Sequence, residues 1–184
     1  MINDKEKLKQ IILEKSYKKG TFKLTSGKVS DFYIDCKQTT LSAEGAYLCG
    51  KLLFEMIKTE NDISAVGGMT LGADPLVTAV SIVSYLDKAP IPAFIIRKEP
   101  KGHGTGSWIE GKGNIPQGRF VAIVEDVVTT GGTLIKAIER TQLEGYNVGI
   151  VLTVVDREEG GRELLAQHGF ELKAIFTKSE LLNK

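Results

Sequence analysis

The sequence has few of the features that mark secreted or membrane proteins. Its 184 residues include only two cysteines, Cys36 and Cys49, too few for a disulfide framework and too far apart for a metal-binding pair. No apolar run approaches the roughly 18 residues that suggest a membrane-spanning helix, and residues 1–7 are charged, unlike a signal peptide. We therefore expect a cytoplasmic protein whose two cysteines are reduced and buried.

An excess of charge of either sign is also absent. Lys and Arg number 24 and Asp and Glu number 23, which gives a net charge of +1 at pH 7. Proteins that bind nucleic acid or membrane surfaces normally need a basic excess, so we expect neither partner, and any cationic site must be local. A chain of this length can bury one full hydrophobic core, which predicts a single domain over residues 1–184.

The N-terminal part of the chain predicts a helix followed by a hairpin-like unit. Residues 4–18 have the periodicity of an amphipathic helix, which Gly20 should end. Residues 22–28 and 32–36 alternate as short strands, with a turn at Ser26-Gly27.

After this unit the pattern changes to strands that alternate with helices. Ser42 is a suitable N-cap for a helix to about residue 59, and later helices should end near residues 86, 144 and 168. The β-type runs between them are residues 65–66, 93–96, 120–124, 148–155 and 172–176. This order predicts an α/β fold with a doubly wound, mainly parallel central sheet and helices on both faces.

In such a sheet, ligands bind at the carboxyl ends of the strands. Four turns rich in glycine or charge follow those ends, at residues 67–75, 97–113, 125–133 and 156–161. The helix over residues 75–86 is apolar almost all round. It could belong to the core or to a subunit interface, and we expect it to be buried on most sides.

Residues 121–133 form the most informative stretch. An apolar run at 121–124 stops at two acids, Glu125 and Asp126, and a helical pattern begins after residue 133. Residues 129–133, Thr-Thr-Gly-Gly-Thr, should therefore form a strand-to-helix turn whose backbone N–H groups can bind a phosphate. The acids could bind sugar hydroxyls or, through water, a cation. Such turns are often only structural, but the adjacent acids favour a site for a phosphorylated sugar.

A second stretch is basic and rich in glycine. Residues 97–119 contain five basic side chains, two acidic ones and several glycines, with an irregular segment at 97–113. Long loops in compact domains are usually either disordered or functional. A cationic loop suits a polyphosphate site, because it can close over the anion and exclude water.

These motifs resemble those of a known enzyme family. The acid pair and the Thr-Gly-rich turn resemble the phosphoribosyl-pyrophosphate (PRPP) signature of type I phosphoribosyltransferases. The pattern Arg-Lys-x-x-Lys-x-His-Gly at residues 97–104 resembles the catalytic loop of one branch, orotate phosphoribosyltransferase. Residues 22–35 and 156–160 resemble the N-terminal signature and the orotate-contacting turn of the same branch. The resemblance extends from about residue 20 to residue 161.

The resemblance implies transfer of the 5-phosphoribosyl group from PRPP to orotate, which yields orotidine 5′-monophosphate and pyrophosphate in de novo pyrimidine biosynthesis. It implies Mg²⁺ bound through PRPP and water rather than by protein ligands, a small N-terminal hood of strands and helix at residues 1–40, and a homodimer with shared active sites. The PRPP contacts it implies are Arg97, Lys98, Lys101, His103, Glu125, Asp126, Val127, Val128, Thr129, Thr130, Gly131, Gly132 and Thr133.

Two of the loop residues would be catalytic. Lys101 is the implied main catalytic cation, and His103 could donate a hydrogen bond or a proton to the leaving group. The planar guanidinium of Arg157 suits the orotate carboxylate, with Thr129 as a second orotate contact.

The sequence also departs from the branch. Several members carry Lys where Thr25 stands here, and Lys in the turn that here reads Ala-Asp-Pro at residues 73–75. The first acid is Glu125 where Asp is common, and Lys23 or Lys28 could take over a missing contact.

Two other functions remain as alternatives. A phosphoribosyltransferase for a purine or for uracil would share the PRPP motifs, but a neutral base has no carboxylate to pair with Arg157. A PRPP-sensing regulator on the same fold would normally carry a DNA-binding extension and a basic face.

Overall fold

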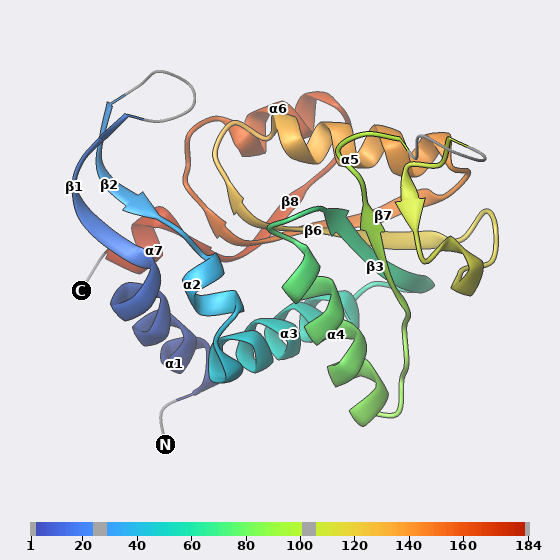
Figure 1. The fold of residues 1–184 in the computed structure, drawn as a ribbon, viewed down its shortest axis with the longest axis horizontal. Helices are drawn as coiled ribbons and strands as arrows, with labels where there is room; N and C mark the ends of the chain where they lie inside the picture. Colours follow the sequence, from blue (N-terminus) through green and yellow to red (C-terminus); the bar gives the residue numbers. More distant parts are fainter. Residues whose placement is uncertain (1–2, 24–28, 101–105, 183–184) are drawn as a thin grey trace.

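The computed structural model describes residues 3–23, 29–100 and 106–182. Within these residues, a six-stranded sheet has the order β5-β4-β3-β6-β7-β8 (Figure 1). The strands are β3 (Ile63–Met69), β4 (Ala93–Ile96), β5 (Ile109–Glu110), β6 (Phe120–Val128), β7 (Asn147–Asp156) and β8 (Leu172–Thr177). Every neighbouring pair is parallel except β4 and β5, which confirms the predicted mainly parallel sheet.

Helices cover both faces of this sheet, as predicted (Figure 1). One face carries α1 (Asp4–Ile11), α3 (Ala43–Ile57) and α4 (Asp74–Leu86), and the other carries α5 (Gly132–Leu143) and α6 (Gly161–Gln167). Strand β6 supplies both layers, because Val124 belongs to the first hydrophobic cluster and Ile123 to the second. This alternation buries the central strand on both faces, which explains its almost continuous apolar sequence.

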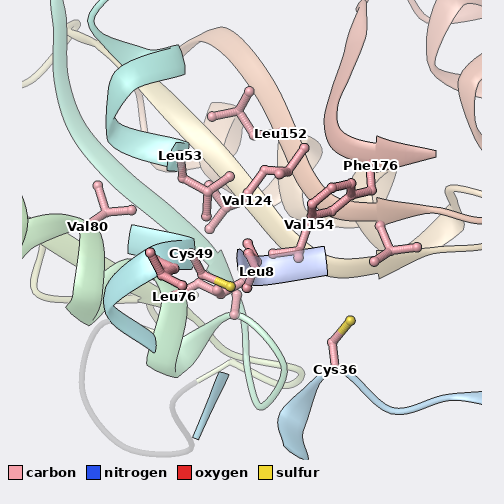
Figure 2. Close-up of a cluster of buried hydrophobic side chains, with 14 of the residues drawn as sticks. Leu8, Cys36, Cys49, Leu53, Leu76, Val80, Val124, Leu152, Val154 and Phe176 are labelled. Atoms are coloured by element: carbon pink, nitrogen blue, oxygen red, sulfur yellow. The ribbon is translucent and has the colours of Figure 1, made fainter. Parts of the chain in front are cut away.

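Figure 2 shows the first cluster, where Leu53 of α3 lies near Val124 and Leu152 of the sheet, and Leu76 of α4 lies on the side of Cys49. Cys36 and Cys49 belong to the same cluster as free, buried thiols, which confirms the prediction. Burial raises the pKa of the Cys49 thiol to about 12, so this side chain behaves as a small apolar residue.

The N-terminal hairpin consists of β1 (Tyr17–Lys23) and β2 (Val29–Ile34), which pair antiparallel. The predicted helix over residues 4–18 is too long: α1 continues only as a π-helical segment, Ile12–Ser16. Tyr17 pairs with Ile34, so strand pairing draws the chain out of the helix before Gly20, which lies inside β1. The predicted turn at Ser26-Gly27 lies outside the described residues.

Three short elements were not expected from the sequence. These are α2 (Lys37–Thr40), α7 (Lys178–Leu182) and β5, which pairs with β4 inside the stretch predicted to be irregular. The next helix, α3, begins as predicted, because the Ser42 hydroxyl accepts a hydrogen bond from the Gly45 N–H. In the described part of the chain, every helix is too short or too polar to cross a membrane.

Strand β6 is longer than predicted. It continues through Glu125 and Asp126 to Val128 rather than ending at residue 124. The backbone of β7 pairs with this extension, with Glu125 opposite Thr153 and Val128 opposite Asp156. Backbone pairing is indifferent to side-chain charge, so the acids lie on the rigid end of the sheet and not in the turn.

The expectation that α4 is buried on most sides is wrong. Leu76, Val77 and Val80 are buried, but Ile82 is 56% exposed and Tyr85 73% exposed. Helix α4 packs against α3, β3 and β4 with one face. Its opposite face is open (Figure 1).

Candidate functional site

The predicted phosphate-binding turn is present between β6 and α5. The strand ends at Val128 and the helix begins at Gly132, so residues 129–131 form the turn. Gly131 has φ +83°, a left-handed conformation that glycine adopts without strain. The first N–H groups of α5 have no partner within the helix and point outwards, where they can bind an anion.

A recess of about 100 Å³ lies directly at this turn, lined by Glu125, Val127, Val128, Thr129, Thr130, Gly131, Gly132, Thr133 and Leu134. The turn is supported from below by the start of α6. A Cβ atom at Gly131 would lie 3.0 Å from the carbonyl oxygen of Gly161. Two glycines thus allow the turn and the neighbouring helix start to pack backbone against backbone.

Glu125 and Asp126 project from the end of β6 and are both largely buried. Burial, followed by the charge of Asp126, raises the pKa of Glu125 to about 8. The Asp126 carboxylate accepts a hydrogen bond from the Val127 N–H at 2.9 Å. It also lies so close to Gly72 that a Cβ atom there would be 2.6 Å from Asp126 Oδ1. A side chain at position 72 would therefore require the Asp126 carboxylate to move.

A second cavity, of about 380 Å³, connects the acids to the turn after β3. Its lining residues are Lys37, Met69, Thr70, Leu71, Gly72, Lys98, Glu125, Asp126, Val127 and Thr133. The structure thus brings Lys98 together with the acid pair, as the motif predicted. It also adds Lys37, which the sequence offered no reason to select because its helix was not expected.

Other residues of the basic stretch are placed differently. The Arg97 guanidinium forms a salt bridge with Glu110 at 2.9 Å and donates to the Glu99 carbonyl at 3.2 Å. It does not line the cavity of the acid pair. Lys101 and His103 lie outside the described residues.

The C-terminal end of α5 and its C-cap, Glu144, hold this basic stretch at two places. Arg140 donates to the Arg97 carbonyl at 2.7 Å, and its guanidinium lies 4.2 Å from the centre of the Trp108 ring. One turn later, Glu144 accepts hydrogen bonds from the Ser107 hydroxyl at 2.8 Å and the Trp108 N–H at 2.6 Å. The helix that begins in the phosphate-binding turn therefore also holds the cationic segment.

Arg157 lies in the turn after β7 and is only 4% exposed. Its Nε and Nη2 atoms lie 2.9 and 2.8 Å from one carboxylate oxygen of Glu159, and its guanidinium lies 4.8 Å from the centre of the Phe32 ring of β2. Its backbone N–H donates to the Val128 carbonyl at 2.9 Å, which places it beside Thr129. The two predicted orotate contacts are therefore adjacent, and Glu159 is an additional residue of this turn that the sequence did not single out.

Neighbouring groups hold this turn in place. Asp156 is fully buried and accepts hydrogen bonds from Arg162 Nε at 3.2 Å and from the Glu158 N–H at 2.9 Å. The Glu158 carboxylate in turn accepts from Ser179 at the start of α7. These contacts fix the backbone on which Arg157 stands.

The raised pKa of Glu125 predicts how stability changes with pH. The folded protein retains this proton up to about pH 8, whereas the unfolded chain loses it near the ordinary value of 4.5. Raising the pH through this range therefore lowers stability, with a slope of at most about 1.4 kcal/mol per pH unit from this group. We expect Glu125→Gln to remove that part of the slope in urea unfolding at pH 5.5 and 8.5. An unchanged slope in the variant would contradict the assignment.

The donors of the site fit a hard cation only in part. The carboxylates of Glu125 and Asp126 are oxygen ligands of the kind Mg²⁺ prefers. However, the described residues contain no group of three or more His, Cys, Asp or Glu side chains that could hold a metal. A magnesium ion here would need further oxygen ligands from a substrate or from water.

The fold and the site together define a phosphoribosyl transferase, and comparison with known proteins agrees. The model of the phosphoribosyl transferase domain family matches residues 40–175. Similar proteins include the orotate phosphoribosyltransferase of Nostoc sp., 47% identical over 177 residues (96% of this chain, 84% of the relative), and that of Aquifex aeolicus, 48% identical over 182 residues (97% and 98%). The chain belongs to the orotate phosphoribosyltransferase family.

Solved structures lead to the same family. The orotate phosphoribosyltransferase of Mycobacterium tuberculosis in complex with Fe(III) dicitrate has a TM-score of 0.83 at 35% identity, covering 98% of this chain and 100% of that one. The same enzyme in complex with PRPP has a TM-score of 0.79 at 32% identity, covering 97% and 99%.

Proposed function

We propose that this protein transfers the 5-phosphoribosyl group from PRPP to orotate, releasing pyrophosphate and forming orotidine 5′-monophosphate in de novo pyrimidine biosynthesis. The observation that carries the proposal is the backbone hydrogen bond between Arg157 and Val128. This backbone contact places the residue that carries a buried guanidinium, suited to a carboxylate, beside a phosphate-binding turn that follows two acids. A metabolic enzyme of this kind would act in the cytoplasm.

The residues divide according to the charges of the reaction. The turn at residues 129–133, with the backbone of Val127 and Val128, binds the 5′-phosphate. Glu125 and Asp126 bind the ribose hydroxyls, and the negative charge of Asp126 stabilises the positive charge that develops on the ribose ring as pyrophosphate leaves. Orotate is held by Thr129 and Arg157 so that its ring nitrogen faces the anomeric carbon.

Basic side chains neutralise the leaving pyrophosphate. We assign this role to Arg97, Lys98, Lys101 and His103, with Lys101 as the main catalytic cation and His103 as a hydrogen-bond or proton donor. Lys98 already lines the cavity of the acid pair, which supports its assignment. Arg97 would have to exchange its Glu110 partner for the ligand.

Phosphoribosyltransferases of this kind generally use Mg²⁺. In this chain Glu125 and Asp126 would hold the ion through water and ribose oxygens, consistent with the donor set described above. When bound, Mg²⁺ neutralises the pyrophosphate oxygens. The protein's own contribution is to orient PRPP.

Arg157 supplies the first test, because it should distinguish orotate from neutral bases. Arg157→Ala should raise the KM for orotate by about 100-fold or more, the effect of losing a charge-assisted bidentate contact. The KM for PRPP should change little. The assay follows orotate absorbance with PRPP and Mg²⁺, with uracil, adenine and hypoxanthine as comparison bases. Turnover of one of these bases in place of orotate by the wild-type enzyme would overturn the proposed substrate.

We also propose that the protein is a homodimer with shared active sites. The open face of α4 supports this, because Ile82 and Leu71 line an apolar cavity of about 530 Å³ that continues to Leu41 of the segment after α2. Exposed apolar patches of this kind commonly mark protein interfaces. The pairing of β1 and β2 in a sheet separate from the six-stranded sheet supports the further division of the single domain into a body and a hood of residues 1–40.

Ile82 provides the test of the dimer. Ile82→Glu places a charge in the centre of the apolar face and should convert the protein to a monomer in size-exclusion chromatography with light scattering. If each site takes Lys101 from the partner subunit, the monomer should also lose most of its turnover. Leu143→Glu is the matched control, since Leu143 is 77% exposed on α5, away from this face. Dimeric, active Ile82→Glu protein would contradict the proposed interface.

A further inference from the structure

Lys37 is a cation of the active-site cavity without an assigned role. It begins the short helix α2, and its side chain lines the 380 Å³ cavity together with Lys98 and the acid pair. Its Nζ atom lies 2.8 Å from the Asp35 carboxylate and 3.8 Å from that of Asp126. The contact with Asp35 holds the side chain at the cavity wall. The side chain is 39% exposed, so a ligand can still reach it.

The charges that line the cavity indicate what a cation at this position can do. Among its described lining residues, Lys37 and Lys98 are the cations, and they face the carboxyl groups of Glu125 and Asp126. A polyphosphate that enters this cavity is repelled by a charged carboxylate, and the repulsion is strong where water is scarce. The Lys37 ammonium group lies beside the Asp126 carboxylate. It therefore offsets part of the negative charge that repels the polyphosphate.

Among the residues that the structure describes, the turn after β3 at residues 70–75 supplies no cation of its own. In the turn after β3, Asp74 accepts a hydrogen bond from the Thr70 hydroxyl at 2.8 Å. Its other carboxylate oxygen is buried and has no hydrogen-bond partner among the residues that the structure describes. Lys37 and Asp74 line the same adjoining cavity, so this lysine is the cation that the acidic turn shares with that cavity.

The ammonium group also retains donors for a ligand. A lysine carries three N–H donors. One reaches Asp35 at 2.8 Å, whereas the distance of 3.8 Å to Asp126 is a charge contact longer than a hydrogen bond. The contact with Asp126 can therefore be exchanged for a phosphoryl oxygen while Asp35 continues to hold the side chain.

We infer that Lys37 binds the diphosphate group of PRPP, as a second cation opposite Lys98. This inference deepens the proposed function and rests on it for the identity of the polyanion. Asp35 positions the ammonium group, and the diphosphate replaces Asp126 as its second anionic partner. The same contact holds pyrophosphate after the ribosyl transfer.

Titration calorimetry with inorganic pyrophosphate and Mg²⁺ tests this directly, because binding is measured without turnover. Lys37→Ala should weaken pyrophosphate binding by about tenfold or more and raise the KM for PRPP similarly. The KM for orotate should stay within about twofold. Lys37→Arg keeps the charge and should recover most of the affinity. Lys173→Ala is the matched control, since Lys173 is similarly exposed and pairs with Glu60 away from the cavity.

The outcomes separate a binding role from a structural one. Unchanged pyrophosphate affinity in Lys37→Ala would overturn the inference, as would an equal loss of affinity for orotate and pyrophosphate, which would mean that the whole site is distorted. Thermal unfolding and size-exclusion chromatography of each variant check the fold and the oligomer. If wild-type protein binds pyrophosphate but does not turn over orotate with PRPP, the proposed function fails while the role of Lys37 in diphosphate binding is still measured.

Discussion

Gly131→Ala is expected to lower kcat/KM for PRPP by about 100-fold or more. Gly131 has φ +83°, and a methyl group there would lie 3.0 Å from the Gly161 carbonyl oxygen. The backbone must therefore move to accept it, and the N–H groups at the start of α5 move with it. Misplacing a binding group by about 1 Å can cost about 100-fold in rate. Steady-state kinetics with PRPP as the varied substrate provides the measurement.

A second glycine separates backbone strain from the loss of the phosphate site. Gly169 has nearly the same φ, +82°, but a Cβ atom there meets no atom within 4 Å. Gly169→Ala should therefore lower the free energy of unfolding by about 1 kcal/mol, the usual cost of a left-handed residue, with activity retained. Equal kinetic effects of the two substitutions would show that the turn at Gly131 does not bind substrate.

Asp126→Asn should lower kcat by about 100- to 1,000-fold, the usual effect of removing one preorganised electrostatic contact from an active site. The substitution is nearly isosteric, and an amide oxygen can still accept the hydrogen bond from the Val127 N–H. What is lost is the negative charge beside the ribose ring. The KM for orotate should stay near the wild-type value, because Arg157 and Thr129 are untouched.

The same variant should change the ionisation of Glu125. The charge of Asp126 is the second largest cause of the raised pKa of Glu125, after burial. Removing that charge should move the pKa of Glu125 down, so the pH dependence of stability between pH 5.5 and 8.5 becomes shallower. Asp87→Asn is the control, since Asp87 forms a salt bridge with Lys58 at the surface, away from the cavity. Turnover within about fivefold of wild type in Asp126→Asn would contradict the electrostatic role.

The layers of the fold follow from local sequence patterns. The alternation of strands and helices predicted the parallel sheet and the helical layers on its two faces, because the hydrophobic periodicity of each element depends only on consecutive residues. Element ends were less accurate. The predicted helix over 4–18 is shortened by pairing of Tyr17 with Ile34, and β6 is extended by pairing with β7. In each case a distant strand decided where the element ends.

The face of α4 shows another limit of sequence patterns. The helix is apolar nearly all round, and burial on most sides was the natural prediction. Ile82 and Tyr85 are nevertheless exposed, because the sheet and α3 cover one side only. An apolar side chain indicates a position that is favourable to bury. It does not indicate whether other parts of the same chain cover that position.

The sequence alone therefore determined the phosphate-binding turn, its two acids and the family to which they belong. Turn chemistry and local spacing depend on neighbouring residues, so Thr129 to Thr133 can be recognised without a structure. Only the tertiary structure placed Lys37 beside Asp126, paired Arg97 with Glu110, and set Glu159 against Arg157. Two of these pairs join different elements of the fold, and the pair of Arg157 and Glu159 depends on how a single turn folds back. Such side-chain contacts leave no periodic signal in the sequence.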